Sequence, residues 1–544
     1  MPVPPTRGVP LGSTPLSRRG FIAAGIAGGF ALTGCSQSTT NASSSSAQMD
    51  AAIAAAEAAR PHSGRTVTAS VTAQPAQIDL GGPIVTTLAY GDTIPGPLIR
   101  AGVGDELVVT VSNRLNSATS LHWHGIALRN DMDGAAPATP NIEAGQDFTY
   151  RFSAPASGTY WGHPHVGLQD DTGLYLPVII DDPAEAGSYD VEWIVVLDDW
   201  TDGVGKSPQQ LYDELTATKP SGPNAPGDTT TTATTGPTST TETTGTTSST
   251  PPTSTTDTTP ASPSGGTQTG SVGTSSLLGG DAGDIAYPYY LINGRIPSAP
   301  TTFNAKPGQR IRIRFINTGS DTAFRVALAG HSMTVTHTDG YPVVPTQVDA
   351  LLIGMAERYD VIVTAANGVF PLVALAEGKN ALARALLSTG AGSPPDPGFQ
   401  PAELNKTVAT VETFTATAPV NLISAEPGLN LPVVLGGDMA KYVWTINGEP
   451  YYRTNPLHIR LGQRPTITFD NPTMMYHPIH LHGHTFQVIR TDGSRGARKD
   501  TIIVLPKQKI TAILVADNPG LWMLHCHNTY HQAAGMQTRL DYVF

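Results

Sequence analysis

The chain has 544 residues and a mass of 56.9 kDa, a length that suits about three domains of ordinary size and excludes a single small one. The net charge is -12 with a pI near 5.6, and the sequence has no basic run, so we expect no nucleic-acid partner. Charged residues make up only 14% while glycine (56) and proline (46) are abundant, a composition typical of an all-β protein with many short strands joined by turns.

Residues 1–35 have the features of an export signal. A twin-arginine motif, Ser-Arg-Arg-Gly-Phe-Ile, occupies residues 17–22, and a weakly apolar run from 23 to 32 follows it. This run is well short of the roughly 20 residues that span a bilayer, so a transmembrane helix is disfavoured. Residues 32–35, Leu-Thr-Gly-Cys, then resemble the lipobox of bacterial lipoproteins, in which the cysteine is lipidated.

The signal predicts export by the twin-arginine route to the bacterial cell envelope, at the outer face of the plasma membrane. A lipid on Cys35 is the only membrane anchor we expect, and cleavage nearby without a lipid is the alternative. Either outcome removes Cys35 from disulfide chemistry and leaves Cys526 unpaired. An unpaired thiol in an exported protein is prone to oxidation unless it is deeply buried or binds a metal.

Residues 36–64 are predicted to form a tether and a short helix. The segment 36–47 is rich in serine, threonine and asparagine and predicts a flexible chain, whereas the alanine-rich segment 49–60 predicts a helix that Pro61 stops. The folded domains are therefore expected to start near residue 65.

A repeated unit predicts three similar β-domains. Each copy is a glycine turn, an alternating strand and a final asparagine, at residues 104–113, 308–317 and 462–471. An Ile-Asn-Gly sequence precedes the second and third copies by the same interval, at 292–294 and 446–448. The three domains are expected over residues 65–186, 187–395 and 396–544.

A long insertion interrupts the second domain near its start. The first and second repeats are 204 residues apart and the second and third 154, so about 50 extra residues lie between the first two. Residues 216–280 are almost entirely Thr, Ser, Pro and Gly, which cannot bury enough apolar surface to offset the entropy of ordering. We expect this insertion to be disordered, with strands before it at 191–197 and after it at 287–292.

Histidines are concentrated in four short blocks, each with a His-x-His pair. The pairs are His122 and His124, His163 and His165, His480 and His482, and His525 and His527. Because neighbouring side chains of a strand point to opposite faces, a spacing of two puts both imidazoles on one face. Four strands would therefore deliver eight imidazoles into a shared space, as a metal centre requires.

A second donor set has the opposite strand parity. Cys526 points away from its two histidine neighbours, and His477 has opposite parity to His480 and His482. A thiolate with imidazoles and a weak thioether is the donor set of an electron-transfer copper site. The alternative is a buried free cysteine beside surface histidines. The second set consists of His477, Cys526, His531 and Met536.

These four blocks, in this order, resemble those of the multicopper oxidases, the laccase and cuprous-oxidase family, from about residue 65 to the end apart from the insertion. The resemblance implies three cupredoxin-like Greek-key β-barrel or sandwich domains, with the type 1 copper in the third, and four copper ions in all. It implies a type 1 site of His477, Cys526, His531 and Met536. It assigns His122 and His480 to the type 2 copper and His124, His163, His165, His482, His525 and His527 to the type 3 pair.

The resemblance also implies an enzyme that couples four one-electron oxidations of a substrate at the type 1 copper to reduction of dioxygen to water. Asp133 matches a family aspartate near the type 2 copper that supplies protons; a turn residue before Gly134 is the alternative. Bacterial relatives often carry a glutamate after the last type 1 histidine, where this chain has Gln532. Asp170 and Asp171 are the two candidates to replace that second proton donor.

The expected reductant depends on the residues beside the type 1 ligands. Met474 and Met475 lie near the expected electron entry and favour Cu(I), because thioethers suit cuprous ion whereas ferrous iron prefers carboxylates; packing in the core is their alternative. We expect cuprous oxidation in copper tolerance together with laccase-like phenol oxidation, in a monomer. Phenol or Fe(II) as the main reductant and a copper-free cupredoxin scaffold are the alternatives, the last weakened by the complete ligand set.

Other histidines are expected to be structural. His484 continues the parity of His482 and is predicted to lie in the core or behind a ligand, while His331 and His337 lack a paired motif. Residues 357–360, Glu-Arg-Tyr-Asp, are predicted to form a buried ion pair at a domain contact.

Overall fold

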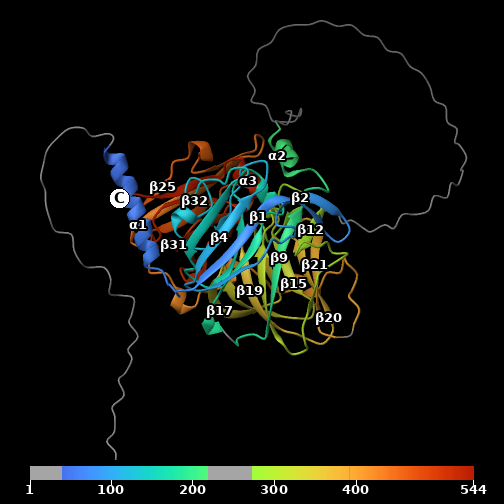
Figure 1. Ribbon diagram of the computed structural model, residues 1–544. Helices are drawn as coiled ribbons and strands as arrows, with labels where there is room; N and C mark the ends of the chain where they lie inside the picture. The colour runs from blue at the N-terminus through green and yellow to red at the C-terminus, as the bar shows by residue number, and fades with distance from the viewer. Residues whose placement is uncertain (1–39, 186, 218–271, 391) are drawn as a thin grey trace, which may run out of the picture. The chain divides into compact units, whose positions relative to one another are not determined.

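The computed structural model describes residues 40–185, 187–217, 272–390 and 392–544, with side chains from residue 46 onward (Figure 1). The export signal, Cys35 and most of the predicted insertion lie outside the described residues. The predicted all-β class is confirmed, because the described chain is built almost entirely of strands in paired sheets. In the part of the chain that the structure describes, no helix combines the length and apolarity that a membrane crossing needs.

The first domain has two four-stranded sheets. One sheet has the order β2-β1-β4-β6 and consists of β1 (Thr66–Asp79), β2 (Ile84–Tyr90), β4 (Glu106–Asn113) and β6 (Asp147–Ser153). The other has the order β3-β8-β7-β5 and consists of β3 (Ile99–Gly102), β5 (His122–His124), β7 (Gly158–His163) and β8 (Leu176–Asp181). Strand β4 shows why they pack: every second residue, including Val109 and Val111, is buried in the core between the sheets.

The second domain has two six-stranded sheets. The sheet β12-β9-β14-β19-β16-β17 contains β9 (Val191–Trp200), β12 (Tyr289–Ile292), β14 (Arg310–Asn317), β16 (Met333–Thr338), β17 (Tyr341–Val348) and β19 (Arg358–Thr364). The sheet β13-β21-β20-β15-β18-β22 contains β13 (Thr302–Asn304), β15 (Phe324–Leu328), β18 (Ala350–Ile353), β20 (Val369–Ala376), β21 (Ala381–Ser388) and β22 (Val408–Ala409).

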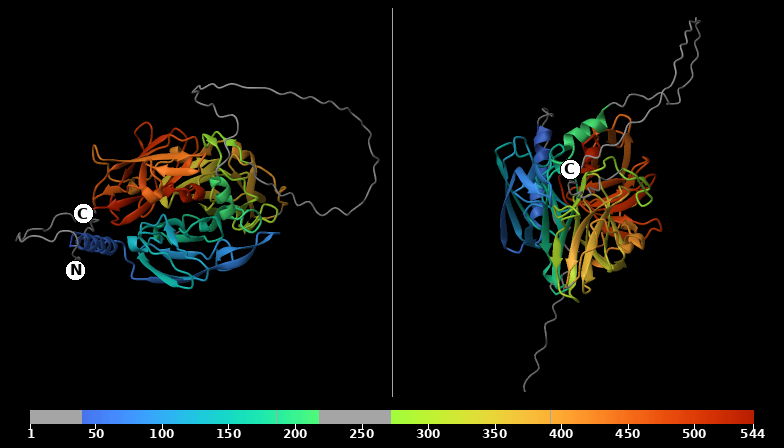
Figure 2. Two further views of the ribbon diagram at one scale, coloured as in Figure 1. Left: turned by 90° about the horizontal axis from the view of Figure 1, so that it is seen from above. Right: turned by 90° about the vertical axis from the view of Figure 1, so that its right-hand side faces the viewer.

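The third domain has sheets of six and five strands. The sheet β24-β23-β26-β31-β28-β29 contains β23 (Asn430–Asp438), β24 (Val443–Ile446), β26 (Thr466–Asp470), β28 (Phe486–Ile489), β29 (Arg495–Lys499) and β31 (Lys509–Leu514). The sheet β25-β33-β32-β27-β30 contains β25 (Leu457–Ile459), β27 (His477–Leu481), β30 (Thr501–Val504), β32 (Leu521–Cys526) and β33 (Gln537–Tyr542). Figure 2 shows these strands, in orange to red, beside the blue to cyan strands of the first domain.

The three predicted repeats are confirmed as β4, β14 and β26, and their final asparagines do the same work. Asn317 donates from its side-chain amide to the carbonyls of Thr322 and Ile353, while its oxygen accepts from the N–H two residues on. Asn113 and Asn471 make the equivalent bonds in the other two domains. Asparagine therefore recurs because one side chain satisfies both sides of the same turn.

Two predicted boundaries around the insertion and the second domain are wrong. Residues 272–280 are ordered, with Leu278 fully buried and β10 (Thr274–Ser275) paired with β11 (Gly280–Asp281), because this end of the segment has apolar side chains to bury. The second domain continues past the predicted end at 395, since β22 pairs with β18 and Leu404 is buried against them.

The helices also differ from the prediction. Helix α1 (Thr40–Ala58) begins within the segment predicted as a flexible tether, which lacks glycine and proline to interrupt it. Helix α2 (Pro208–Thr216), before the insertion, was not predicted; a capping box between Ser207 and Gln210 starts it. The third helix, α3 (Thr529–Ala533), follows β32 directly.

Candidate metal centre

Strand pairing brings the four histidine blocks together in two sheets. In the first domain β5 pairs with β7, which places His122 opposite His163. In the third domain β27 pairs with β32, which places His480 opposite His525. The two sheets meet face to face, because the rings of His122 and His482 stack with their centroids 3.7 Å apart, as do those of His124 and His480.

Eight imidazoles therefore share one space between the first and third domains. Their nitrogens form overlapping groups of three in which all ligand atoms lie within 4.8 Å of one another, including His122 with His480 and His482, and His165 with His482 and His525. Seven of the eight side chains are buried and His165 is half-buried. The structure thus brings together every residue of the first predicted donor set.

Most of these rings are held by the nitrogen that faces away from the shared space. His122 Nδ1 lies 2.8 Å from the Asp133 carbonyl, His480 Nδ1 lies 3.0 Å from the Asp500 carbonyl, and His163 Nδ1 lies 3.0 Å from the Pro164 carbonyl. Each acceptor fixes the proton on the outer nitrogen, so the inner nitrogen carries a lone pair. The protein therefore sets the tautomers that a metal would need.

The inner nitrogens have no hydrogen-bond partner within the described residues. Buried nitrogens in this condition are His122 Nε2, His124 Nδ1, His163 Nε2, His165 Nε2, His480 Nε2 and both nitrogens of His527. A single unpaired buried polar atom costs about 1–3 kcal/mol, so a group of seven is not a stable apolar core. These residues fit a metal cluster, because each of the six rings would give one of these nitrogens to an ion.

The contact between His482 and His525 further supports a metal at this site. His482 Nε2 and His525 Nε2 lie 3.1 Å apart, while their Nδ1 atoms are bound to Asp133 Oδ2 and to the Cys526 carbonyl, each at 2.9 Å. Both Nδ1 atoms carry the proton, so two lone pairs face each other. Burial, reinforced by neighbouring imidazoles, also holds the pKa of each ring well below its usual value and disfavours an extra proton. A bound metal cation resolves the repulsion.

The second donor set lies on the other face of β32. Cys526 Sγ is 3.7 Å from His477 Nδ1 and 3.8 Å from His531 Nδ1, and these two nitrogens are 3.1 Å apart. Met536 is fully buried, and its carbonyl accepts from the Cys526 N–H at 3.0 Å. Burial raises the pKa of the Cys526 thiol, so a thiolate there requires a metal.

Asp284 closes this second set from outside and was not predicted. Its Oδ2 lies 3.0 Å from His531 Nε2 and accepts a hydrogen bond of 2.6 Å from the Tyr442 hydroxyl. His531 therefore keeps its proton on Nε2 and its lone pair on Nδ1, facing Cys526. Asp284 comes from the second domain, and no sequence signal connects a single aspartate to a histidine so far along the chain.

Asp133 lies at the site, as predicted. It is buried, its Oδ2 holds His482, and its Oδ1 lies 3.3 Å from His122 Nδ1 without a hydrogen bond in the described chain. It also fills the turn position: at Gly134, φ is +84° and an added Cβ would lie 1.8 Å from the Leu121 carbonyl oxygen. Asp133 therefore precedes a turn that requires glycine and also contacts two histidines of the set, while its role in proton supply stays a prediction.

Gln532 and the two aspartates considered as replacements for a second proton donor are placed differently. Gln532 Nε2 lies 3.2 Å from His165 Nδ1, and Asp170 reaches His163. Asp171 instead accepts from the hydroxyls of Tyr287 and Tyr530. Gln532 and Asp170 thus contact the histidines, whereas the contacts of Asp171 lead to tyrosines.

Of the two methionines proposed for substrate entry, one is exposed and one is buried. Met474 is 67% exposed, but Met475 is only 3% exposed and packs in the core, so the entry role predicted for Met475 is wrong. His484 is buried between the His482 carbonyl and the Tyr542 hydroxyl. His331 and His337 bond within the second domain and to Glu185, as structural residues do.

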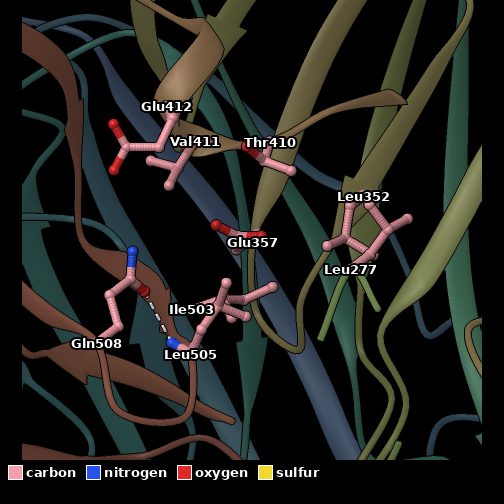
Figure 3. Close-up of a pocket in the computed structure, with 9 residues that line it drawn as sticks. All are labelled: Leu277, Leu352, Glu357, Thr410, Val411, Glu412, Ile503, Leu505 and Gln508. Atoms are coloured by element: carbon pink, nitrogen blue, oxygen red, sulfur yellow. Dashed lines mark hydrogen bonds between the residues drawn. The ribbon is translucent and has the colours of Figure 1, made fainter. Parts of the chain in front are cut away.

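Surface pockets lie near both donor sets. A pocket of about 400 Å³ is lined by His165, Gln532 and Tyr212, and another of about 490 Å³ by Tyr442 and Tyr451. A smaller pocket of about 60 Å³ lies among Leu277, Leu352, Glu357 and Ile503 (Figure 3). No cluster histidine lines this third pocket, so it is not the metal centre.

Comparisons with known proteins agree with this geometry. Three family models, each described as multicopper oxidase, match residues 72–185, 192–392 and 426–543. Over 543 residues that cover both chains completely, the sequence is 68% identical to multicopper oxidase MmcO of Mycobacterium tuberculosis. It is 29% identical over 555 residues to copper resistance protein A of Escherichia coli, covering 81% of this chain and 87% of that protein.

A solved structure shows the same fold. Fet3p, a multicopper oxidase that functions in iron import, superposes with a TM-score of 0.68 at 19% sequence identity, covering 88% of this chain and 90% of that one.

Proposed function

The chain belongs to the multicopper oxidase family and is a copper oxidoreductase that reduces dioxygen; from that premise we propose that it oxidises cuprous ion in copper tolerance and also accepts phenols. The observation that carries the proposal is the pair of donor sets joined at Cys526, one of soft donors and one of eight imidazoles with inward lone pairs.

We propose that four copper ions bind at the residues inferred from the sequence. A type 1 ion would be held by His477, Cys526, His531 and Met536. A type 2 ion would be held by His122 and His480. A type 3 pair would be held by His124, His163, His165, His482, His525 and His527. Copper, when bound, supplies one-electron oxidation of the reductant at the first set and four-electron reduction of dioxygen to water at the second.

The chain itself connects the two sets. Cys526 is joined by peptide bonds to His525 and His527, so the residue that holds one set is covalently bound to two members of the other. The pairing of β27 with β32 fixes this connection, because Ile479 lies opposite Cys526 while His480 lies opposite His525. Electron transfer between the sets therefore needs no moving part.

Dioxygen reduction also consumes protons, and we propose Asp133 as their donor. The carboxyl is buried beside two rings of the imidazole set, where Oδ2 holds the His482 Nδ1 proton and Oδ1 makes no hydrogen bond to the described part of the chain. The carboxyl lies on the Nδ1 side of both rings, so it would supply protons from behind the imidazole set rather than from within the shared space. The Gln532 amide next to His165 has no ionisable proton and cannot add to the supply.

Cuprous ion is favoured as the reductant by two observations. The exposed Met474 lies three residues before His477, and a thioether is a good ligand for Cu(I). Relatives with 29% identity carry the name copper resistance protein A. The tyrosine-lined pocket that Tyr442 shares favours phenols as further reductants, because Tyr442 is one hydrogen bond from Asp284 and two from His531.

We further propose that the enzyme acts as a monomer at the outer face of the plasma membrane, held by a lipid on Cys35. The sequence signals at residues 17–22 and 32–35 support this location. Cys35→Ala should move the enzyme from the membrane fraction to the soluble fraction without changing its oxidase rate.

Oxygen uptake by copper-loaded enzyme, measured with Cu(I), Fe(II) and a phenol in turn, tests the proposed reductant. We expect the highest kcat/KM with Cu(I), and Met474→Leu should raise KM for Cu(I) while leaving that for the phenol unchanged. A higher kcat/KM with Fe(II) or the phenol would overturn the cuprous assignment and leave the oxidase family unaffected.

A further inference from the structure

His124 is oriented opposite to its neighbours in the imidazole set. Among the described residues, His122, His163, His165 and His480 have no partner at Nε2 and are held at Nδ1, whereas His124 has none at Nδ1 and is held at Nε2. A strand position alone does not fix which nitrogen of a histidine ring faces the shared space. Something outside the strand must select this orientation.

The selecting group is a buried carboxylate from the third domain. His124 Nε2 lies 3.2 Å from Asp500 Oδ1 and 3.1 Å from Thr501 Oγ1, and the Thr501 hydroxyl itself donates to Asp500 Oδ1 at 2.8 Å. With an acceptor at Nε2, the proton stays there and the Nδ1 lone pair faces the shared space. Asp500 therefore fixes both the tautomer and the rotation of His124.

Asp500 is in turn clamped by Arg358 of the second domain. Arg358 Nη1 donates to Asp500 Oδ1 at 2.7 Å and Nη2 donates to Oδ2 at 2.6 Å, a bidentate pair with both side chains fully buried. Arg358 Nε donates to the Thr159 carbonyl of the first domain at 3.1 Å. The planar guanidinium therefore sets the carboxylate plane relative to the strand pair β5–β7, which a lysine with its single ammonium cannot do.

Gly125 supplies independent support for this arrangement. It directly follows His124, has φ of +85°, and an added Cβ would lie 2.2 Å from Arg358 Nη2 and 2.7 Å from Asp500 Oδ2. The ion pair thus occupies the space that a side chain at position 125 would fill. The His-Trp-His-Gly motif therefore ends in glycine because the Arg358–Asp500 ion pair packs against position 125.

We infer that Arg358 is a positioning residue for the three-copper site: through Asp500 it holds His124 with Nδ1 inward, although Arg358 contacts no histidine. The second domain, which contributes no imidazole to the set, thereby takes part in building it. The inference rests on the proposed metal centre. It predicts that weakening the clamp perturbs the imidazole set while sparing the type 1 set.

The test variant is Arg358→Lys, which keeps the charge but loses the bidentate geometry. Arg312→Lys is the matched control, because Arg312 is also buried and pairs with Asp360 at 2.6 Å, but that pair contacts no histidine of the set. In copper-free protein with ¹⁵N-labelled histidine, we expect the His124 Nδ1 resonance to move from the pyridine type towards the average of both tautomers in Arg358→Lys only.

In copper-loaded protein we expect Arg358→Lys to keep the blue absorption band but to bind less copper in total. The copper that remains should show a larger paramagnetic fraction, because a disturbed type 3 pair would lose its magnetic coupling. Gly125→Ala should reproduce this pattern. The inference would be overturned if the His124 resonance were unchanged in both Arg358→Lys and Gly125→Ala. It would also be overturned if the control Arg312→Lys shifted that resonance equally. Wild-type protein that binds no copper would instead overturn the proposed function, and the copper-free measurement separates the two failures.

Discussion

At the scale of single residues, function depends on which atom of a side chain faces the metal centre, and Cys526 shows this most clearly. It is fully buried within the described chain, holds one donor set with its sulfur and is bonded through its backbone to two members of the other. The sequence was sufficient to predict this, because strand parity is a local property that needs no knowledge of the rest of the fold. Orientation of individual rings was not predictable, since the groups that select it come from other domains.

Substituting the thiol separates the two donor sets. Cys526→Ser should abolish the blue band and steady-state oxidation, because a hydroxyl does not replace a thiolate as a soft ligand. The imidazole set should still bind its copper, since none of its nitrogens is changed. Copper analysis with visible absorption checks both parts, and retained steady-state oxidation would exclude the connection through Cys526.

Asp133 allows a test of proton supply that preserves geometry. Asp133→Asn can still accept from His482 Nδ1 through its amide oxygen, but it cannot release a proton. We expect copper content and the blue band to be retained while turnover at neutral pH falls by about 10²-fold, the lower end of general acid catalysis. A turnover number equal to that of the wild type would assign proton supply to another group.

At the scale of secondary structure, helices and strands position the ligand side chains, as the short helix α3 does for His531. Asn528 caps it by accepting from the N–H groups of Tyr530 and His531, and Asp321 of the second domain accepts from the Asn528 amide at 2.6 Å. His531 is therefore positioned by the helix cap and by an interdomain hydrogen bond together. The four strands were predictable from alternation and spacing; this cap was not, because a five-residue helix has too short a pattern to detect.

Removing the cap should loosen one ligand of the type 1 set. Asn528→Ala should lower the free energy of unfolding by about 1 kcal/mol, the usual value of an N-cap, and should shift the blue band because His531 gains freedom. Urea denaturation and visible absorption measure these effects. As a comparison, Thr410→Ala removes the capping box of the single-turn helix Val411–Thr413, beside the third pocket, which no cluster histidine lines, and should leave the band unchanged; a band unaffected by Asn528→Ala would show that the cap does not position His531.

At the scale of the whole molecule, the metal centre is a domain interface. The first domain supplies four imidazoles, the third supplies the other four and the second donor set, and the second supplies Asp284 and Arg358. The predicted buried ion pair at residues 357–360 is confirmed, and its link to His124 is what the sequence could not reveal. The missed residues are single side chains that become functional only when three domains pack together.

The free energy of unfolding of the copper-free protein should depend on pH, because the domain interface buries many imidazoles. Burial lowers the pKa of His124, His165, His477, His480, His482, His525 and His527 below the value of about 6.5 expected in the unfolded chain. The unfolded state therefore binds more protons in acid, so stability is full above about pH 6.5 and falls as the pH decreases below it.

Urea midpoints of copper-free protein between pH 8 and pH 5 measure this dependence. We expect a constant midpoint down to about pH 6.5 and a steep decrease below it, with copper loading moving the decrease to lower pH because metal and protons compete for the same nitrogens. A midpoint independent of pH over this range, with or without copper, would contradict neutral buried imidazoles.

The most direct test of the central claim is the ratio of reductant oxidised to dioxygen consumed by copper-loaded enzyme, with hydrogen peroxide measured in the same vessel. A chain that joins a one-electron site to a cluster reducing dioxygen completely to water should consume four equivalents of Cu(I) or phenol per dioxygen and release no peroxide. Two equivalents per dioxygen with release of peroxide, or no oxygen uptake by protein that has bound its copper, would contradict it.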